Sequence, residues 1–175
     1  MAKKSMVLLK NDTNLLPLKK EGQKIALIGP LAAEKNSPLG SWRISSDDHT
    51  AVSVLEGMNA YSGNTINYTK GIDLIIGETS FIKEVNINTT NREGIQEAVE
   101  AAKNVDVVVM VLGEHGFHSG ESRSRTTLDL PGLQQALLEA VFKANKNIVL
   151  VLNNGRPLTI EWASQNIPSI LVGWQ

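Results

Sequence analysis

The chain has 175 residues, of which 42% are hydrophobic and 20% charged, and its formal charge at pH 7 is −1. A length of this order is typical of one domain with a sizeable core, and a charge near zero gives no electrostatic reason to expect nucleic acid or a membrane surface as a partner. The sequence holds no cysteine, which excludes disulfides and thiol chemistry, and no apolar run approaches the ~20 residues that a membrane-spanning helix needs.

Apolar runs and turn residues divide the first half of the chain into short elements. Residues 24–28 form an apolar run that ends at Gly29 and Pro30, which indicates a buried strand. Residues 31–51 lack a periodic pattern, and long ordered loops in compact domains are often functional. In chain order we expect a short helix within 4–10, a strand at 24–28, a loop over 31–51, an amphipathic helix over 51–61, a strand at 65–68, and a loop with an edge strand over 72–90.

The most informative stretch follows a predicted helix that Asn91 caps and that ends at Lys103. Residues 105–112 are a nearly continuous apolar run without period-two alternation, as in a strand buried on both faces of a parallel sheet. Residues 113–125, in contrast, contain glycines, two histidines, two glutamates and two arginines. Because ligands of open α/β sheets bind outside the carboxyl ends of the strands, we expect the functional site here.

Helix and strand patterns alternate again after this polar stretch. Pro131 suits the first position of a helix, which we expect over 132–145. A strand at 147–152, a short helix at 158–163 and a last strand at 169–174 follow. This alternation predicts a three-layer α/β/α sandwich with a mostly parallel, flavodoxin-like sheet.

Right-handed crossovers place the carboxyl ends of parallel strands at one edge of the sheet. The loops that leave this edge would gather polar and aromatic side chains into a single rim. Its members are Trp42, Glu114, His115, His118, Glu121, Arg123, Arg125 and Arg156.

The glutamates of the rim suit acid/base chemistry. A loop carboxyl beside apolar and aromatic surface can have a raised pKa and serve as a general acid, and glycosidases need two carboxyls that flank the scissile bond. Equally, a loop glutamate is often only solvated or paired with a nearby arginine.

Other ligand sites are open on the same residues. The side chains of Glu114, His115, His118 and Glu121 are of the types that bind zinc or iron, although the glycines between them fix no common face. Trp42 either stacks on a sugar ring or anchors its loop in the core. A dinucleotide site is unsupported, because no GxGxxG pattern follows the first strand.

At these residues the sequence resembles the C-terminal α/β sandwich domain of glycoside hydrolase family 3, close to bacterial periplasmic β-glucosidases. The matching pieces occur in family order over nearly the whole chain, and each is weak alone. They are residues 5–11, 15–18, 25–30, 40–42, 106–114, 121–125, 128–131, 149–157 (with Asn154-Gly155-Arg156-Pro157) and 173–174.

The resemblance implies a retaining hydrolase of β-linked glucosides or oligosaccharides that acts between a barrel domain and this sandwich. The barrel would supply the nucleophilic aspartate, and the sandwich would supply the general acid/base. That acid/base position matches Glu121, whereas Glu114 matches a family position without the acid role. Trp42 matches a tryptophan that stacks on the sugar beyond the cleaved bond, and His118 and Arg125 are further candidates for substrate contact. We expect no cofactor and no metal.

The barrel is missing from these 175 residues, and family members continue beyond the point that matches Gln175. We therefore expect residues 1–175 to be one excised and truncated sandwich domain, inactive without the N-terminal barrel of the same full-length chain. A periplasmic or secreted location follows from the resemblance alone. The alternative is a non-catalytic carbohydrate-binding or domain-docking module, which needs no carboxyl with a raised pKa.

Overall fold

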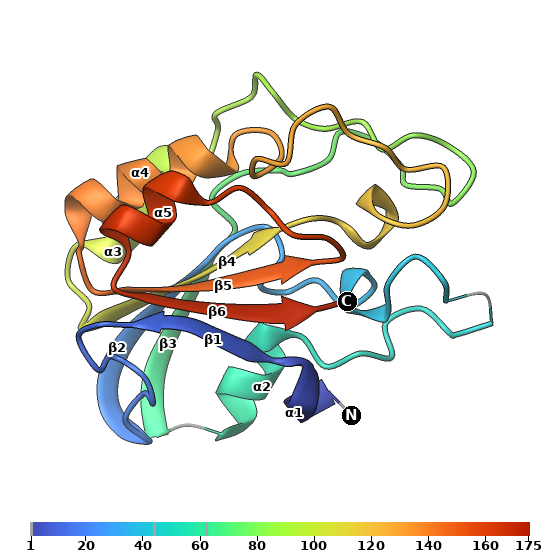
Figure 1. Ribbon diagram of the computed structural model, residues 1–175. Helices are drawn as coiled ribbons and strands as arrows, with labels where there is room; N and C mark the ends of the chain where they lie inside the picture. Colours follow the sequence, from blue (N-terminus) through green and yellow to red (C-terminus); the bar gives the residue numbers. More distant parts are fainter. Residues whose placement is uncertain (1, 44, 62) are drawn as a thin grey trace.

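A computed structural model describes residues 2–43, 45–61 and 63–175, so residue 44 of the predicted loop 31–51 lies outside the described residues. Six strands form one sheet in the order β1-β6-β5-β4-β2-β3. Strand β1 is antiparallel to β6, and all other neighbours are parallel. Helices cover both faces of the sheet (Figure 1), which confirms the predicted α/β sandwich.

The strands predicted at 24–28, 105–112, 147–152 and 169–174 lie next to one another and parallel in this sheet, and the strand predicted at 65–68 pairs in parallel with the first of them. The elements, in chain order, are α1 (Ala2–Ser5), β1 (Val7–Asn11), β2 (Glu21–Ile28), η1 (Ser37–Leu39), α2 (Val54–Tyr61), β3 (Gly63–Thr69), α3 (Ile95–Ala102), β4 (Val107–Gly113), η2 (Gly116–His118), α4 (Gln134–Ala144), β5 (Ile148–Asn154), α5 (Glu161–Asn166) and β6 (Ser169–Trp174).

Successive residues of the central strand β4 face opposite layers of the sandwich. Val108, Met110 and Leu112 pack in the core that also contains buried residues of α3, α4 and α5. Residues 107, 109 and 111 belong to the second core, against which α2 and residues 15–18 pack. Every residue of β4 is buried, which explains why its sequence is apolar throughout rather than alternating.

The predicted helix within residues 4–10 is wrong. Only residues 2–5 are helical, and Val7–Asn11 form the edge strand β1. Short isolated helices are marginal in water, whereas this segment gains main-chain hydrogen bonds to β6. Residues 6–9 are between 42% and 54% exposed, so their apolar character reflects an edge strand and not a helix face.

The expected starts of α3 and α4 also need correction. Asn91 does not cap α3, because its side chain accepts a hydrogen bond from the Glu93 amide in a preceding turn and the helix begins at Ile95. Pro131 does not begin α4, because Gly132 has a φ of 66° and the helix begins at Gln134. The edge strand predicted within residues 72–90 is not formed. Among the described residues, this loop has one isolated antiparallel β-bridge, between Ile75 and Ile87.

Two glycines end neighbouring strands at the edge where the predicted site lies. Gly29 after β2 and Gly113 at the end of β4 both have a φ of 133°. A Cβ atom at Gly29 would lie 2.2 Å from the Val111 carbonyl oxygen, and one at Gly113 would lie 2.1 Å from that of Asn153. Only glycine fits such contacts, so these positions turn the chain out of the sheet into the long loops.

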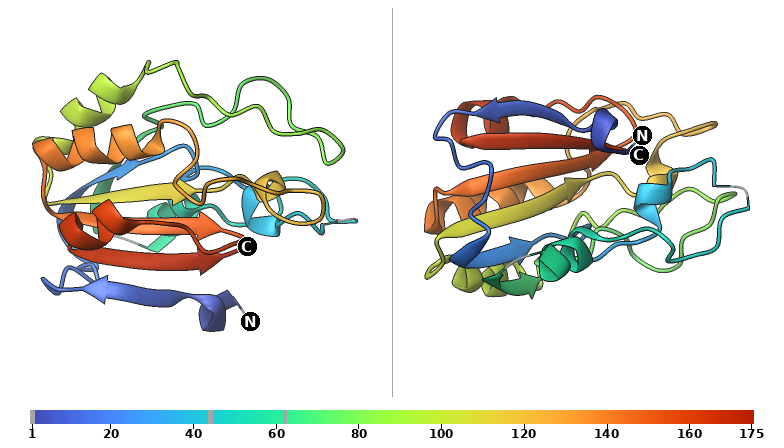
Figure 2. Two further views of the ribbon diagram at one scale, coloured as in Figure 1. Left: turned by 45° about the horizontal axis from the view of Figure 1, so that its top comes forward. Right: turned by 90° about the horizontal axis from the view of Figure 1, so that it is seen from below.

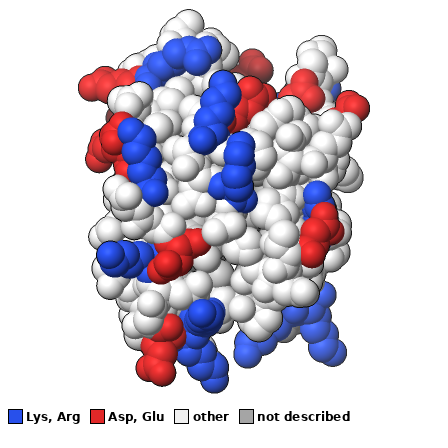
Figure 3. Space-filling view, turned by 90° about the vertical axis from the view of Figure 1, so that its left-hand side faces the viewer, with Lys and Arg blue, Asp and Glu red and all other residues white. Residues whose placement is uncertain are grey.

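The long loops project together from this edge, as both views in Figure 2 show. The face at the opposite ends of the parallel strands carries lysines, arginines and acidic side chains interspersed with one another (Figure 3). The carboxyl-end edge therefore differs from the rest of the molecule in the length of its loops, and the site lies there.

Candidate functional site

The loop after β4 and the loop after β2 form an open cleft, which we call the Trp42 cleft. It has a volume of about 570 Å³ and is lined by Ser41, Trp42, Arg43, Ser46, Asp48, Phe81, Phe117 and Glu121. Trp42 is 63% exposed, so it does not anchor its loop in the core. The exposure of Trp42 favours the hypothesis that its ring stacks on a ligand over the hypothesis that it anchors its loop in the core.

The two loops touch at a glycine beside Glu121. A Cβ atom at Gly120 would lie 2.3 Å from Ser41 Oγ and 4.0 Å from Trp42 Nε1. The φ of Gly120 is 105°, so both the contact and the backbone require glycine. This close approach places Glu121 and Trp42 in the same cleft, although they are far apart in sequence.

Aromatic side chains form the inner wall of the Trp42 cleft. The rings of Phe81 and Phe117 meet edge to face with centroids 6.1 Å apart. The Arg43 guanidinium lies 5.3 Å from the centre of the Phe117 ring and also pairs with Asp48. An apolar wall with a few polar groups at its edge is typical of sites that bind small molecules.

His118 and Arg125 lie in a second pocket on the other side of Phe117. This pocket, of about 550 Å³, is lined by Glu84, Val85, Ile87, Phe117, His118, Ser122, Arg123, Ser124, Arg125, Thr126, Thr127, Pro131 and Gly132. His118 Nδ1 is buried there without a hydrogen-bond partner. Burial, followed by the positive charge of Arg125, lowers the pKa of His118 to about 4, so the imidazole is neutral at pH 7.

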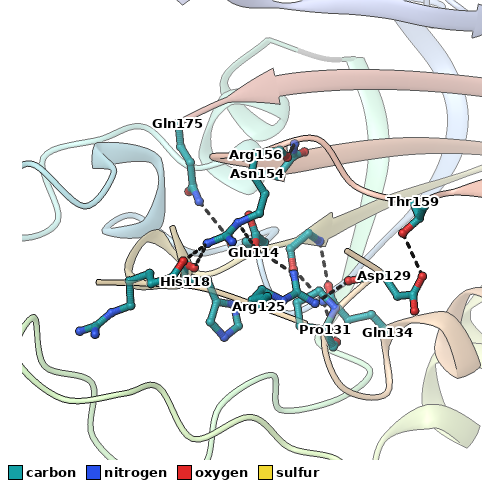
Figure 4. A network of polar contacts seen from close by, with 12 residues as sticks. Glu114, His118, Arg125, Asp129, Pro131, Gln134, Asn154, Arg156, Thr159 and Gln175 are labelled. Atoms are coloured by element: carbon teal, nitrogen blue, oxygen red, sulfur yellow. Dashed lines mark hydrogen bonds and ion pairs between the residues drawn. The ribbon is translucent and has the colours of Figure 1, made fainter. Parts of the chain in front are cut away.

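A buried carboxylate stands at the end of β4. Glu114 is wholly buried, and its Oε1 accepts a hydrogen bond of 2.9 Å from Arg125 Nη1. Arg156 Nε lies 3.1 Å from the same oxygen, close enough for an ion pair, although its N–H is not directed at that oxygen. Both arginines reach the carboxylate, as Figure 4 shows. Glu114 therefore carries a structural ion pair and is not open to substrate.

Sequence reasoning named these three residues as members of the rim but missed their network. The signal was present, because Glu114 directly follows a strand that is buried at every position, and a carboxylate at such a place needs a cationic partner. It also missed the role of Arg123, whose guanidinium donates to the carbonyls of Phe117, Phe81 and Lys83. Arg123 thus ties the loop over 81–83 to the loop after β4.

The residues proposed as metal ligands do not converge. Glu114 is held by two arginines, and His115 lies in a different pocket from His118, beside Glu34 and Arg43. His115 Nδ1 accepts a hydrogen bond from the Phe117 amide, and burial lowers the pKa of His115. Within the part of the chain that the structure describes, no three His, Asp or Glu side chains are grouped to hold a metal.

The structure thus divides the four predicted site residues into two pairs, Trp42 with Glu121 and His118 with Arg125, with Phe117 lining both spaces. Among the described residues, no helix is both long and apolar enough to cross a membrane. The arrangement offers an exposed carboxyl beside aromatic surface, next to a pocket that is lined by hydroxyls and arginines.

Comparison with known proteins assigns the family. A β-xylosidase of Formosa agariphila is 41% identical over 99% of this chain, and a periplasmic β-glucosidase of Salmonella typhimurium is 40% identical over 99%. The chain spans about a quarter of the length of these curated relatives, 23% and 24%. A crystal structure of a β-glucosidase from Listeria innocua in complex with isofagomine superposes with a TM-score of 0.82 at 32% identity, over 98% of this chain and 22% of that one. The family profile of the glycosyl hydrolase family 3 C-terminal domain matches residues 6–175, and the chain therefore belongs to that family.

Proposed function

We propose that residues 1–175 are the acid/base-bearing sandwich domain of a retaining β-glucosidase, and that Glu121 is its general acid/base. The nucleophilic aspartate would come from an N-terminal barrel domain of the same full-length protein. The relatives support this division, because the chain matches only about a quarter of their length. On this proposal the domain alone does not turn over glucosides.

The observation that carries the proposal is the shared cleft of Glu121 and Trp42. Glu121 is exposed at the edge of an aromatic wall, whereas Glu114, the other glutamate of the same loop, is wholly buried between arginines. A group that transfers protons to and from a substrate must be reachable. Of these two carboxyls, only Glu121 meets that condition.

The reaction has two steps in which Glu121 exchanges one proton. In the first, the aspartate attacks the anomeric carbon, the bond to the glycosidic oxygen breaks, and the Glu121 carboxyl gives its proton to that oxygen. In the second, water attacks the anomeric carbon of the glycosyl-enzyme and gives a proton back to the Glu121 carboxylate, while the bond from that carbon to the aspartate breaks, so that the sugar leaves with retained configuration and the aspartate is again a carboxylate.

The neighbouring residues bind the substrate. We propose that Trp42 stacks on the sugar beyond the cleaved bond, and that the neutral His118 contacts the substrate from the second pocket. Arg125 lines the same pocket, but its Nη1 and Nη2 already bind Glu114 and the Asp129 carbonyl. Its contact with substrate is therefore secondary to its hold on Glu114.

The test is Glu121→Ala in the full-length enzyme, with Glu78→Ala, at an exposed glutamate of the 72–90 loop, as the matched control. We expect hydrolysis to slow by ~10²–10⁴-fold, with the smallest loss for aryl glucosides that have good leaving groups. Azide should restore the rate with those substrates, because it attacks the glycosyl-enzyme without a general base. Azide rescue in Glu84→Ala or Glu114→Ala instead of Glu121→Ala would move the acid/base elsewhere.

The non-catalytic alternative gives the opposite pattern. A carbohydrate-binding module would lose sugar binding on Trp42→Ala and would be indifferent to Glu121→Ala. We also propose a periplasmic or secreted location, which is supported by the similarity to the periplasmic β-glucosidase of Salmonella typhimurium. Cell fractionation of the source organism, followed by an antibody against this domain, tests it.

A further inference from the structure

One guanidinium holds the backbone on both sides of Glu121. Arg156 Nη2 donates hydrogen bonds to the carbonyl oxygen of His118 and, at 2.9 Å, to that of Arg123. The first carbonyl lies three residues before Glu121 in the sequence and the second lies two residues after it. A single planar group that bonds both of them fixes their separation, and hence the shape of the segment 118–123.

Arg156 is itself anchored in the sheet. Its Nε lies 3.1 Å from Oε1 of the buried Glu114, and its side chain is 18% exposed. Glu114 follows directly on β4, and its backbone amide donates to the Asn153 carbonyl of β5. The position of the guanidinium is therefore set by the carboxyl ends of two central strands of the sheet.

Glycine at position 155 brings the same turn against the segment. A Cβ atom there would lie 2.0 Å from Ser119 Oγ and 2.8 Å from Ser119 Cβ. Gly155 is not among the residues of positive φ, so the contact with Ser119, and not the backbone angle, requires glycine. On the opposite side Gly120 packs against Ser41 of the Trp42 loop. The segment is thus enclosed between the turn 154–157 and the loop that carries Trp42.

We propose that the turn 154–157 is a positioning element that sets the Glu121 carboxyl within the Trp42 cleft. Arg156 clamps the backbone on both sides of Glu121, and Gly155 fixes how closely the segment approaches the sheet. Within the described part of the chain no hydrogen bond or ion pair joins Arg156 to Glu121, so Arg156 and Gly155 act through the loop. The inference rests on the proposed function and adds two positioning residues to it.

The first test is a double-mutant cycle of Arg156→Ala and Glu121→Ala in the full-length enzyme. Misplacement of a catalytic group by about 1 Å can cost ~10²-fold, so we expect Arg156→Ala to lower kcat by about 10–100-fold. The loss should be greater for poor leaving groups and partly relieved by azide, as in Glu121→Ala. In the Glu121→Ala background Arg156→Ala should cost less than about 2-fold more, because coupled residues are not additive. Arg92→Ala is the control, because Arg92 is exposed and far from Arg156 in the sequence.

The second test leaves Arg156 unchanged and alters the contact between residues 155 and 119. Gly155→Ala should push Ser119 away and give the same leaving-group dependence and azide response as Arg156→Ala. Adding Ser119→Gly removes the Cβ and Oγ atoms that the new methyl group would meet, so the pair should regain at least half of the lost rate on a logarithmic scale. This comparison remains decisive if Arg156→Ala fails to fold.

The outcomes separate the two proposals. If Glu121→Ala itself lacks leaving-group dependence and azide rescue, the proposed function fails. If Glu121→Ala shows both, but the Arg156 and Glu121 losses multiply and Ser119→Gly gives Gly155→Ala no relief, the turn has only a general structural role and the positioning proposal is overturned.

Discussion

Removing Arg125 should expose how much the fold depends on the buried Glu114 carboxylate. Arg125→Met keeps an aliphatic stem of similar length but takes away the group that donates to Glu114 Oε1 at 2.9 Å. The remaining cationic neighbour of the Glu114 carboxylate is then Arg156, whose N–H does not point at Oε1. The other carboxylate oxygen, Oε2, has no hydrogen-bond partner among the described residues even before the substitution. The wholly buried charge becomes largely uncompensated.

Breaking a buried ion pair from one side typically costs 3–5 kcal/mol. A glutamate of ordinary pKa can instead take up a proton, which at pH 7 costs about 4 kcal/mol and sets an upper limit. We therefore expect Arg125→Met to lower the free energy of unfolding by about 3–4 kcal/mol. Glu114→Gln should cost less, since both arginines are 17–18% exposed and keep hydrogen bonds to backbone carbonyls.

Urea unfolding at pH 7, followed by far-UV circular dichroism with m held constant across variants, measures these differences. The pair Glu114→Gln with Arg125→Met removes the orphan charge, so it should be more stable than Arg125→Met alone. If the two costs simply add, or if Arg125→Met costs less than about 1 kcal/mol, the carboxylate is solvated in solution and the reasoning is refuted.

Two further predictions concern the same edge of the sheet. Gly113→Ala should destabilise the chain by more than about 3 kcal/mol, because its Cβ atom would meet the Asn153 carbonyl oxygen at 2.1 Å, whereas Gly77→Ala, at a φ of 81° in open space, should cost about 1–2 kcal/mol in the same urea assay. The pKa of the His118 imidazole should be near 4 when followed by NMR, whereas the unfolded chain takes up this proton near pH 6.5. The free energy of unfolding that depends on the neutral ring, at most about 3 kcal/mol, is therefore complete above pH 6.5. It is lost as the pH falls from 6.5 toward 4. His118→Gln should flatten the stability curve in that interval and His49→Gln, at an exposed histidine, should not; an unchanged curve in His118→Gln would contradict the assignment.

The sheet could be predicted because its strands are buried on both faces. Runs such as 25–28 and 107–112 have no polar residues that would give a helix a solvent face, and their alternation with helices predicted the parallel order. The edge strand β1 could not be recognised in the same way. Its apolar residues are half exposed, and its conformation comes from pairing with β6 at the far end of the sequence, which no local pattern records.

The helix starts failed for a local reason. Asn91 and Pro131 are favourable near a helix start, but Gly94 and Gly132 follow them with φ values of 90° and 66°. A residue in the left-handed region interrupts a helix, so each helix begins only after its glycine. Propensity at one position was outweighed by the conformation of a neighbour that only glycine adopts.

The candidate site was predicted as a set of residues on one edge, and in the structure these residues lie in the loops of that edge, divided between two pockets. What the sequence did not contain was the pairing within the set. The partners of Glu114 come from loops after two different strands, and the contact of Gly120 with Ser41 joins loops that are far apart in the chain. Contacts between loops that are distant in the sequence become visible only in the folded structure.

The two glutamates of the loop after β4 illustrate why position relative to the strand matters for chemistry. Glu114 is the first residue beyond β4, so it is still inside the protein, where a carboxylate is tolerated only with cationic partners. Glu121 lies beyond a turn and a glycine, at the edge of an open cleft. On the proposed function Glu121 must gain and lose a proton, which a carboxyl that holds two arginines could not do without breaking its ion pairs. The proposal therefore gives the two carboxyls of this loop different roles, and the turn 154–157 joins them, because Arg156 contacts the first and holds the backbone that carries the second.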